Sequence, residues 1–455
     1  MSEDQEILSR RALLGAGVAA GAGTLVASQD AQAAPAKPVI VEFPAPHVQQ
    51  DVSAALQAAM NRAATNGHIL QLGAGIYSCS GLSLPSGLTL RGVPGQTRLV
   101  LAGGGPLLKG SKADRVCLSH IIFDGDGLPL AEDVSALLRL SRCEQLALTS
   151  CEITGSAKSG LVLEQCSGVI ASNHMHELRE VAVLSYNANA LRIEGNIVSD
   201  CGDGGILVYR WSEGPDGTLI TGNRVSKIAA QSGGTGQNGN GINVFRADNV
   251  TISNNKVSDC TFSAIRANAS SNVQILGNTC HRSGEVALFV EFGFQGAIVG
   301  NNLIETAASG ISITNFNDGG RLAVCSNNVL RDITGTGPYA QDNPGFGVGI
   351  AVEADTSVTG NVVEDVRVTG INLGWGPYMR NLIAAQNSVR SAPVGISVSF
   401  AADEATALIS QNIISGCTVN IAGFRWHEQV SGDLALSAEG LPGSIRVADN
   451  LVSAL

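Results

Sequence analysis

Aromatic and charged residues are scarce in this chain of 455 residues. Aromatic residues make up 4% of the sequence and charged residues 15%, whereas glycine occurs 55 times. This composition is typical of short strands joined by tight corners, where glycine supplies backbone conformations that other residues avoid. The formal net charge of -11 excludes the broad basic surface that displaces counterions from a polyanion. We therefore expect no nucleic-acid partner.

The spacings typical of metal sites are also missing. The ten cysteines include no Cys-x-x-Cys or Cys/His pattern, so no metal and no cofactor is predicted. In the segment His174-Met175-His176 we expect one ring inward and one outward, or both rings on a loop. Cys143 and Cys166 lie 23 residues apart, which places them within disulfide reach if they stack vertically. Buried free thiols are favoured over a disulfide.

The first 33 residues resemble an export signal. Arg10 and Arg11 precede a Gly/Ala-rich stretch, and residues 31–33 (Ala-Gln-Ala) form a small-residue cleavage site. The pattern predicts cleavage of residues 1–33, export of the folded chain by the twin-arginine translocase, and a periplasmic or secreted protein without a stable membrane span. A plain Sec signal or a short anchor is the alternative, although the Gly/Ala stretch is weak and short for a span.

Asparagine recurs at an interval close to one coil of a parallel β-helix. The steps from 173 to 196 and from 255 to 278 are each 23 residues, and loop insertions explain the longer ones. Stacked coils align like residues, so the side-chain amides are expected to hydrogen-bond from coil to coil. The predicted asparagine ladder comprises Asn173, Asn196, Asn223, Asn255, Asn278, Asn301, Asn327, Asn361, Asn387 and Asn412.

A second pattern places two apolar residues inward on another strand, as in Gly205-Ile206-Leu207-Val208 and Gly241-Ile242-Asn243-Val244. The two patterns give each coil at least two strands, with room for a third. Residues 67–455 are therefore predicted to form an all-β, single-stranded parallel β-helix of about 12 coils. Residues 34–66 are predicted to be a linker followed by an amphipathic helix that caps the first coil.

Several segments resemble the right-handed parallel β-helix superfamily typified by pectate lyases and polygalacturonases. They are the amphipathic helix, the turn Gly73–Tyr77, the strand Ser86–Gly92 and the Gly-Asn coils. With its paired arginines, the chain most resembles a twin-arginine-exported β-helix repeat family of unassigned activity, over roughly residues 48–455. The polygalacturonase motifs and the Asp-Pro-His-Asp of alginate epimerases are absent, so no catalytic residue carries over from either.

Enzymes of this superfamily usually work in a groove along one sheet, so the outward positions of the Gly-Ile strand are candidates for a site. They combine aromatic rings, which stack on sugars, with arginines that bind carboxylates through two nitrogens. The predicted substrate-binding residues are Tyr209, Arg210, Asn243, Phe245, Asn268, Asn315 and Trp375.

Four residues are the predicted catalytic set: Glu291, Glu353, Arg246 and Arg266. The two glutamates lie on one rung two coils apart, about 9.6 Å between backbones, within reach of the 6.5–9.5 Å carboxyl separation of an inverting glycosidase. Alternatively, an arginine neutralises a uronate carboxylate while a base takes the C5 proton, for elimination or epimerisation. A purely structural reading, in which Arg266 pairs with Glu291 as a solvated ion pair, stays open.

Two inserted loops, residues 228–240 and 334–347, are expected to wall a groove of roughly 19 Å. Residues 424–428 (Phe-Arg-Trp-His-Glu) are expected to belong to the final coil or cap rather than to a site. Glu353 and Asp355 are the candidate ligands for a calcium ion, but two acids fall short of six to eight oxygen ligands.

The sequence thus predicts an exported, monomeric β-helix that binds an acidic polysaccharide of the cell envelope or the extracellular space. Its activity would be that of a lyase, a glycoside hydrolase or a uronate epimerase. The alternative is a non-catalytic carbohydrate-binding or structural protein of the cell surface.

Overall fold

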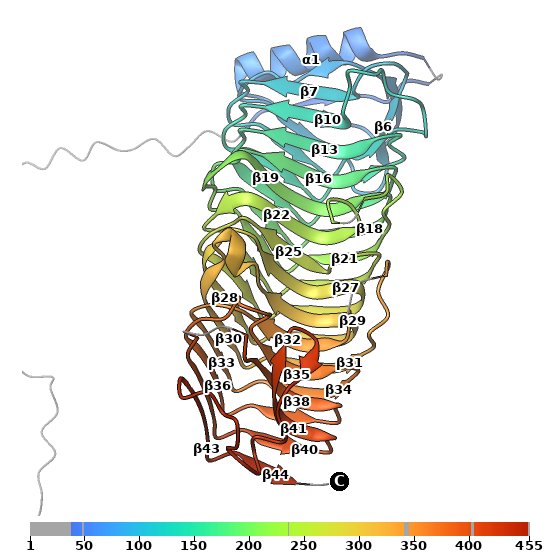
Figure 1. Cartoon of the computed structure of the whole chain (residues 1–455). Coiled ribbons are helices and arrows are strands. Elements are labelled where there is room, and N and C mark those ends of the chain that lie inside the picture. The colour runs from blue at the N-terminus through green and yellow to red at the C-terminus, as the bar shows by residue number, and fades with distance from the viewer. Residues whose placement is uncertain (1–37, 48–49, 235, 341–344, 402–404, 454–455) are drawn as a thin grey trace, which may run out of the picture. The chain divides into compact units, whose positions relative to one another are not determined.

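The computed structural model describes residues 38–47, 50–234, 236–340, 345–401 and 405–453. From Val39 onward they belong to one compact unit built almost entirely of parallel strands (Figure 1). Arg10 and Arg11 of the predicted export signal lie outside the described residues. In the part of the chain that is described, no helix has the length and apolar character needed to cross a membrane.

The strands wind into three parallel stacks, one strand of each stack per complete coil. The first stack is a 16-stranded sheet. Its strands are β1 (Ile40–Phe43), β2 (Ile69–Leu72), β5 (Thr89–Arg91), β8 (Cys117–Ser119), β11 (Leu146–Thr149), β14 (Gly168–Ala171), β17 (Arg192–Glu194), β20 (Leu219–Thr221), β23 (Thr251–Ser253), β26 (Val273–Leu276), β28 (Gln295–Gly300), β30 (Arg321–Ser326), β33 (Thr356–Thr359), β36 (Leu382–Ala385), β39 (Ala407–Ser410) and β43 (Ile445–Ala448).

The strands of the second stack follow the asparagine turn. They are the additional strand of each coil for which the two sequence patterns left room. Its strands are β3 (Gly75–Cys79), β6 (Thr97–Leu101), β9 (Ile122–Asp124), β12 (Glu152–Thr154), β15 (His174–Leu178), β18 (Ile197–Cys201), β21 (Arg224–Ile228), β24 (Lys256–Cys260), β27 (Thr279–Glu291), β29 (Leu303–Ile313), β31 (Val329–Ile333), β34 (Val362–Val366), β37 (Ser388–Arg390), β40 (Ile413–Ser415) and β44 (Leu451–Ser453).

The third stack carries the Gly-Ile pattern, and the long strands β27 and β29 continue into it from the second stack. Its other strands are β4 (Leu82–Ser83), β7 (Leu108–Ser111), β10 (Ala136–Ser141), β13 (Ser159–Glu164), β16 (Val181–Tyr186), β19 (Gly204–Pro215), β22 (Asn240–Asp248), β25 (Ile265–Asn268), β32 (Val348–Val352), β35 (Thr369–Leu373), β38 (Val394–Ser399) and β41 (Val419–Arg425). The predicted right-handed parallel β-helix is confirmed, with more coils than the predicted twelve, because the coils before residue 173 carry no ladder asparagine.

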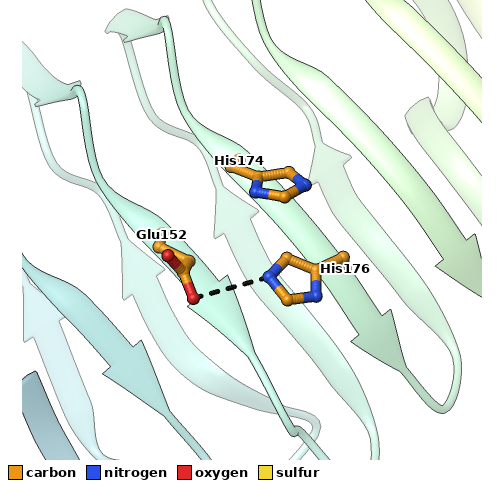
Figure 2. Close-up of side chains that lie close together, drawn as sticks. All are labelled: Glu152, His174 and His176. Carbon is orange, nitrogen blue, oxygen red and sulfur yellow. Dashed lines mark ion pairs between the residues drawn. The ribbon is translucent and has the colours of Figure 1, made fainter. Parts of the chain in front are cut away.

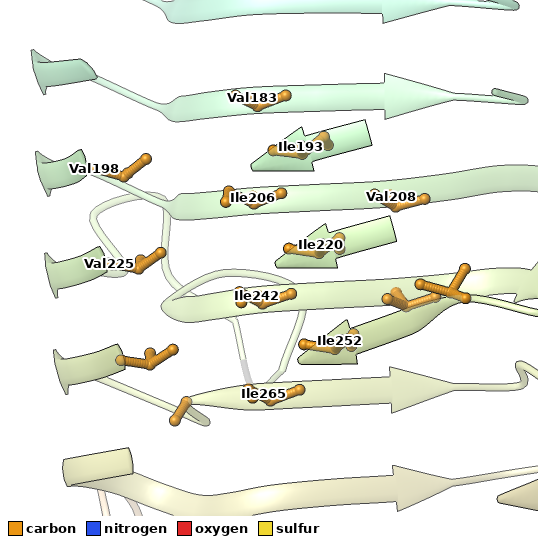
Figure 3. Packing of buried hydrophobic residues seen from close by; sticks show 14 of the residues in the cluster. Val183, Ile193, Val198, Ile206, Val208, Ile220, Val225, Ile242, Ile252 and Ile265 are labelled. Carbon is orange, nitrogen blue, oxygen red and sulfur yellow. The ribbon is translucent and has the colours of Figure 1, made fainter. Parts of the chain in front are cut away.

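The core runs along the axis of the coils as columns of aliphatic side chains (Figure 3). Ile206, Ile242 and Ile265 are register partners in the third stack, and each is fully buried. Ile220 and Ile252 form the facing column in the first stack. Burying each such side chain stabilises the fold by about 1.5–3 kcal/mol, so every coil is held mainly by the coils above and below.

An amphipathic helix, α1 (Ser53–Asn66), packs on the first coil as predicted (Figure 1). Its buried residues include Leu56, Met60 and Ala63, which helical spacing places on one face. The helix ends at Gly67, whose left-handed conformation (φ 65°) is the usual helix stop. The apolar end of the solenoid is thereby covered.

The asparagine ladder is continuous, but it does not use Asn301 and Asn327. Its members bond through side-chain amides, Nδ2 to Oδ1, at 2.9–3.0 Å. They are Asn173, Asn196, Asn223, Asn255, Asn278, Asn302, Asn328, Asn361, Asn387, Asn412 and Asn450. In the pairs Asn301-Asn302 and Asn327-Asn328, as in Asn254-Asn255, the first residue is exposed and left-handed (φ 58° at Asn301 and Asn327), and the second turns inward. Gly195 and Gly222 hold the left-handed position in other coils.

All ten cysteines are free, and eight of them are buried. The Cys143 and Cys166 thiols lie close enough to hydrogen-bond. This bond lowers the pKa of Cys143 to about 7, while it raises the pKa of Cys166. The cysteines therefore pack as small apolar core residues.

Candidate functional site

The outward residues of the third stack form vertical columns, because the strands pair in parallel register. Asn243, Arg266 and Phe289 are successive partners in one column. Tyr209, Phe245, Asn268 and Glu291 are successive partners in the other. Two residues on neighbouring coils of a column are separated by one strand spacing, so each column runs without a break along the outer side of the stack. Asn243, Arg266 and Glu291 are nevertheless buried.

The N-terminal coils of these two columns carry aromatic side chains. The rings of Tyr209 and Phe245 meet edge to face at 5.8 Å between centroids, and Asn243 Nδ2 donates to the Tyr209 hydroxyl at 3.0 Å. Arg246 lies over the Phe245 ring at 4.7 Å, and its Nη1 donates to the Trp211 carbonyl at 3.0 Å. Four of these residues are predicted site residues, and the structure brings them together.

Arg210 belongs to a separate hollow of about 610 Å³ on the same flank, lined also by Asn187, Trp211 and Glu213. Its Nη1 is 3.9 Å from the Asp216 carboxylate and 3.5 Å from the Ala188 carbonyl. The guanidinium is thus held against the protein rather than presented to a ligand.

Arg266 and Glu291 form a buried ion pair, 2.6 Å between Nε and Oε1. Asn268 Nδ2 donates to the same carboxylate oxygen at 2.7 Å, and Glu285 lies 3.8 Å from Arg266 Nη1. Burial raises the pKa of Glu291, although Arg266 and Asn268 act in the opposite direction. Burial opposes the charge on Arg266, but its bond to Glu291 and the charges of both glutamates raise its pKa. The pair predicted as a solvated one is buried: Glu291 is 3% exposed.

The two inserted loops meet at this cluster. Gly236, in the first loop, approaches so closely that a Cβ there would lie 2.1 Å from Arg266 Nη1. In the second loop, the Tyr339 hydroxyl donates to Glu285 Oε1 at 2.6 Å, and its ring packs against Phe262 and Phe346. The loops therefore cover the buried charges, which accounts for their burial.

Glu353 lies in a different environment, at a cavity of about 490 Å³ near the C-terminal end of the third stack. The residues that give this C-terminal cavity its chemistry are Glu353, Arg367, Asn372, Trp375, Trp426 and His427. The two indole rings meet edge to face, 5.7 Å between centroids at 77°. Glu291 does not line this cavity, so the two predicted catalytic glutamates stand in separate surroundings.

The carboxyl of Glu353 is poised to exchange a proton near neutral pH. The residue is only 7% exposed, and this burial raises its pKa to about 7 despite a hydrogen bond of 2.7 Å from the Phe316 N–H to Oε2. Phe316 begins the short 3-10 helix η1 (Phe316–Asp318). A carboxyl that titrates near 7 suits general acid–base chemistry.

Asn315 and Asp355 have structural partners. Asn315 is left-handed (φ 72°), and its Oδ1 accepts a hydrogen bond from the Phe292 N–H at 3.2 Å. Asp355 accepts hydrogen bonds from Arg321 at 2.8 Å and from Arg380, and these bonds hold its pKa at about 2. Because two arginines occupy its carboxylate, Asp355 is not a free oxygen ligand for calcium.

One wall of the C-terminal cavity is formed by residues that the sequence analysis assigned to the final coil or cap rather than to a site. After β41 the chain folds back in an antiparallel hairpin with β42 (Glu428–Gln429), pairing Phe424 with Gln429. This places Trp426 and His427 at the cavity. The signal in the sequence was the chemical richness of residues 424–428, but the turn that directs them to Trp375 is a tertiary feature.

His174 and His176 both project outward from β15, and Met175 between them is fully buried. The expectation of one ring inward was wrong, as was the loop alternative, because a strand alternates every two residues and so exposes both histidines on one face. Glu152 of the neighbouring strand faces them (Figure 2).

Two families match parts of the chain. Residues 212–389 match the family described as a right handed beta helix region, and residues 97–279 match that described as periplasmic copper-binding protein (NosD). No curated protein gives a significant match.

Solved structures share the fold at low identity. The N-terminal fragment of bacteriophage phi29 gene product 12 is 14% identical with a TM-score of 0.53, covering 84% of this chain and 71% of that one. The A-module of the Azotobacter vinelandii mannuronan C-5 epimerase AlgE4 is 17% identical with a TM-score of 0.49, covering 67% and 96%. A mannuronic acid specific polysaccharide family 6 lyase from human gut microbiota is 14% identical with a TM-score of 0.46, covering 91% of each.

Fold and family matches together define the class. The chain has the right-handed parallel β-helix fold, and residues 212–389 match the family of that name. Each family match covers less than half of the chain, so a narrower assignment has to come from the site.

Proposed function

We propose that this protein is an exported, monomeric β-helix that binds an acidic polysaccharide in the C-terminal cavity and moves a proton on the bound sugar through Glu353. The observation that carries the proposal is a buried carboxyl with a pKa of about 7 in the same cavity as Trp375 and Trp426. Indole faces stack on sugar rings, and a few convergent polar groups then fix the orientation of the ligand.

The reaction that suits this lining is removal of the C5 proton of a uronate. Arg367 at the cavity supplies a cation for the substrate carboxylate, and the ionised Glu353 takes the proton. In elimination, the electron pair forms the C4–C5 double bond, the C4–O bond breaks, and the leaving oxygen takes a proton from His427 or water. In epimerisation, C5 instead regains a proton on its other face.

A glycosidase with two carboxylates receives less support. Glu291 is engaged by Arg266 and Asn268 outside the C-terminal cavity, so it has no direct path to a sugar bound beside Glu353. The predicted roles of Arg246 and Arg266 likewise do not transfer to this cavity. Tyr209, Phe245 and Asn243 lie several coils away and would bind a distant part of a long polymer.

The second candidate is a carbohydrate-binding protein without catalysis. It is favoured by one observation: Glu353 accepts a hydrogen bond from the Phe316 N–H and so has a structural role in holding η1. In that case the tryptophans bind the sugar and the carboxyl only shapes the wall of the cavity.

Export is proposed from residues 1–33 and is supported by the match of residues 97–279 to a periplasmic family. A chain in which Arg10 and Arg11 are both replaced by Lys should stay in the cytoplasm, whereas the unaltered chain should reach the periplasm or the medium. Equal export of both chains would contradict the twin-arginine route.

The catalytic proposal is tested with a panel of uronate polymers, including alginate and pectate. Elimination appears as ultraviolet absorbance of the unsaturated product and epimerisation as new sugar signals in NMR. Glu353→Gln should lower turnover at least about 100-fold while polymer binding persists, since a positioned acid–base group contributes that much. Trp375→Ala should weaken binding itself.

The matched control is Glu364→Gln, because Glu364 lies on the second stack and pairs with Arg390 at 2.9 Å. Turnover that survives in Glu353→Gln would remove the assigned role of that carboxyl. Polymer binding without turnover, lost in Trp375→Ala, would establish the non-catalytic candidate. Absence of binding across the panel would reject both.

A further inference from the structure

A second cluster of reactive side chains lies on the second stack, whereas the C-terminal cavity lies on the third. His174 and His176 come from β15, and Glu152 comes from the adjacent strand β12 (Figure 2). Glu152 and His174 are direct register partners, and His176 follows two residues along the strand. Three potential ligands therefore occupy the corners of a triangle on one face of a sheet.

The ligand atoms of this triangle are already close to metal-binding separations. One donor atom from each residue can be chosen so that all three lie within 4.8 Å of one another. His176 Nε2 is 3.5 Å from Glu152 Oε1, and the two imidazole centroids are 4.2 Å apart. Ligands of a tetrahedral ion with bonds of about 2.0–2.2 Å stand roughly 3.3 Å apart. Side-chain rotation alone would close the remaining gap.

The backbone beneath the triangle is held rigidly. Met175 and Ile153, the inward neighbours of the three ligands, are fully buried and are register partners of each other. The parallel pairing of β12 and β15 fixes the Cα positions before any ion arrives, so little ordering of the backbone opposes binding.

A contact with Thr154 orients the ring of His176. Thr154 Oγ1 lies 3.4 Å from His176 Nδ1, on the side of the ring away from Glu152. When Nδ1 carries the proton and donates to this hydroxyl, the lone pair of Nε2 faces the glutamate and is free for a metal. Metal-binding histidines are commonly held in this way by a partner at the other ring nitrogen.

The face in front of the triangle is open. A cavity of about 520 Å³ is lined by two of the three ligands, Glu152 and His174, together with His120 and Ile197. Two imidazoles and one carboxylate leave a bound ion with free positions, and here these would face the cavity. Such a set, open on one side, is found in catalytic rather than closed structural metal sites.

We propose that Glu152, His174 and His176 bind one divalent late first-row transition-metal ion, with exchangeable positions directed into the neighbouring cavity. Imidazole nitrogen suits copper and zinc, whereas calcium and magnesium prefer sites made of oxygen alone. For one set of ligands, Cu²⁺ is bound more tightly than Zn²⁺. The proposal does not depend on the activity assigned to the C-terminal cavity.

The test uses the full chain, purified without a polyhistidine tag and stripped with a chelator. Titration with Cu²⁺ and, separately, with Zn²⁺ in a calorimeter should give one site per chain, tighter for Cu²⁺. The electron paramagnetic resonance spectrum of the Cu²⁺ form should show coupling to two nitrogens. His174→Gln and His176→Gln should each weaken binding at least about tenfold and reduce the coupling to one nitrogen.

The matched control is His281→Gln. His281 also projects from the second stack, and its Nδ1 lies 3.3 Å from Glu305, but no second histidine accompanies it there among the residues described. Its substitution should leave metal affinity unchanged. Equal affinity in the His281 and His174 variants would overturn the site, as would absence of stoichiometric binding of either ion. Far-ultraviolet circular dichroism of the apo variants separates lost ligands from lost folding.

Discussion

The asparagine ladder permits a test that separates two adjacent asparagines. Asn302 donates from Nδ2 to the Ile275 carbonyl at 3.0 Å and to Asn328 Oδ1 at 2.9 Å. Its Oδ1 accepts from the Asn278 N–H at 2.9 Å and from Asn278 Nδ2 at 3.0 Å. Asn301, by contrast, is exposed and left-handed, and it serves only as the corner before the ladder residue.

Asn302→Ala leaves two donors without their partner in the dry interior, the Asn278 N–H and one hydrogen of the Asn278 amide, and removes the side-chain bond to the Ile275 carbonyl. Each unsatisfied buried group costs about 1–3 kcal/mol, so the loss of stability should be at least about 2 kcal/mol. Asn302→Asp should be comparably harmful, because a carboxylate oxygen would face two acceptors. Asn301→Gly should change stability by under about 0.5 kcal/mol, because glycine tolerates the left-handed conformation.

Urea unfolding followed by far-ultraviolet circular dichroism measures the three variants side by side. Because coils contact only their neighbours, hydrogen exchange should also show local loss of protection around residues 278 and 302 in Asn302→Ala. Equal midpoints for Asn302→Ala and Asn301→Gly would refute the claim that the second asparagine of the pair carries the ladder.

Three further predictions follow from the buried charges and thiols. Arg266→Met should lower the free energy of unfolding in urea by about 3–5 kcal/mol, because it leaves buried carboxylates unpaired. Replacing the exposed Arg246 by Met should lower it by under about 0.5 kcal/mol. Similar losses in the two variants would contradict burial as the cause. The pKa of Glu353 is raised from 4.5 to about 7, so the protonated carboxyl stabilises the folded state in full below pH 4.5. This stabilisation is lost as the pH rises through 7. Native stability should decline over that interval by up to about 3 kcal/mol, and a Glu353→Gln variant that declines equally would exclude this carboxyl as the source. The native chain should resist alkylation at its eight buried cysteines, and mass spectrometry after unfolding should count ten modified thiols; eight would indicate a disulfide.

Some elements of the site follow from sequence alone. The Gly-Ile pattern placed Asn243 and Arg266 at outward positions of neighbouring coils, because residues in parallel strands stack whenever their apolar neighbours must face a common core. The same reasoning, applied to the third strand of the coil, would have placed both His174 and His176 outward. That error came from not extending the alternation rule to the segment after the asparagine turn.

Other features required distances between residues far apart along the chain. The Asn-Asn pairs were ambiguous, because Gly300-Asn301 resembles the Gly-Asn corner of other coils, and only the inward amide of Asn302 completes the ladder. The loops bearing Gly236 and Tyr339 were visible in the sequence as insertions. The sequence did not show that both reach the cluster of buried charges around Arg266.

The sequence by itself determined the solenoid, since regular apolar and asparagine positions have one efficient way to bury their side chains and satisfy their amides. Tertiary structure decided which polar residues became reactive. Glu291 and Glu353 share a column and a residue type, yet one is neutralised by Arg266 and the other lies in a cavity with Trp375. The reason is that a pKa depends on burial and on neighbouring charges, and the loops and hairpins that supply both lie many residues away in sequence.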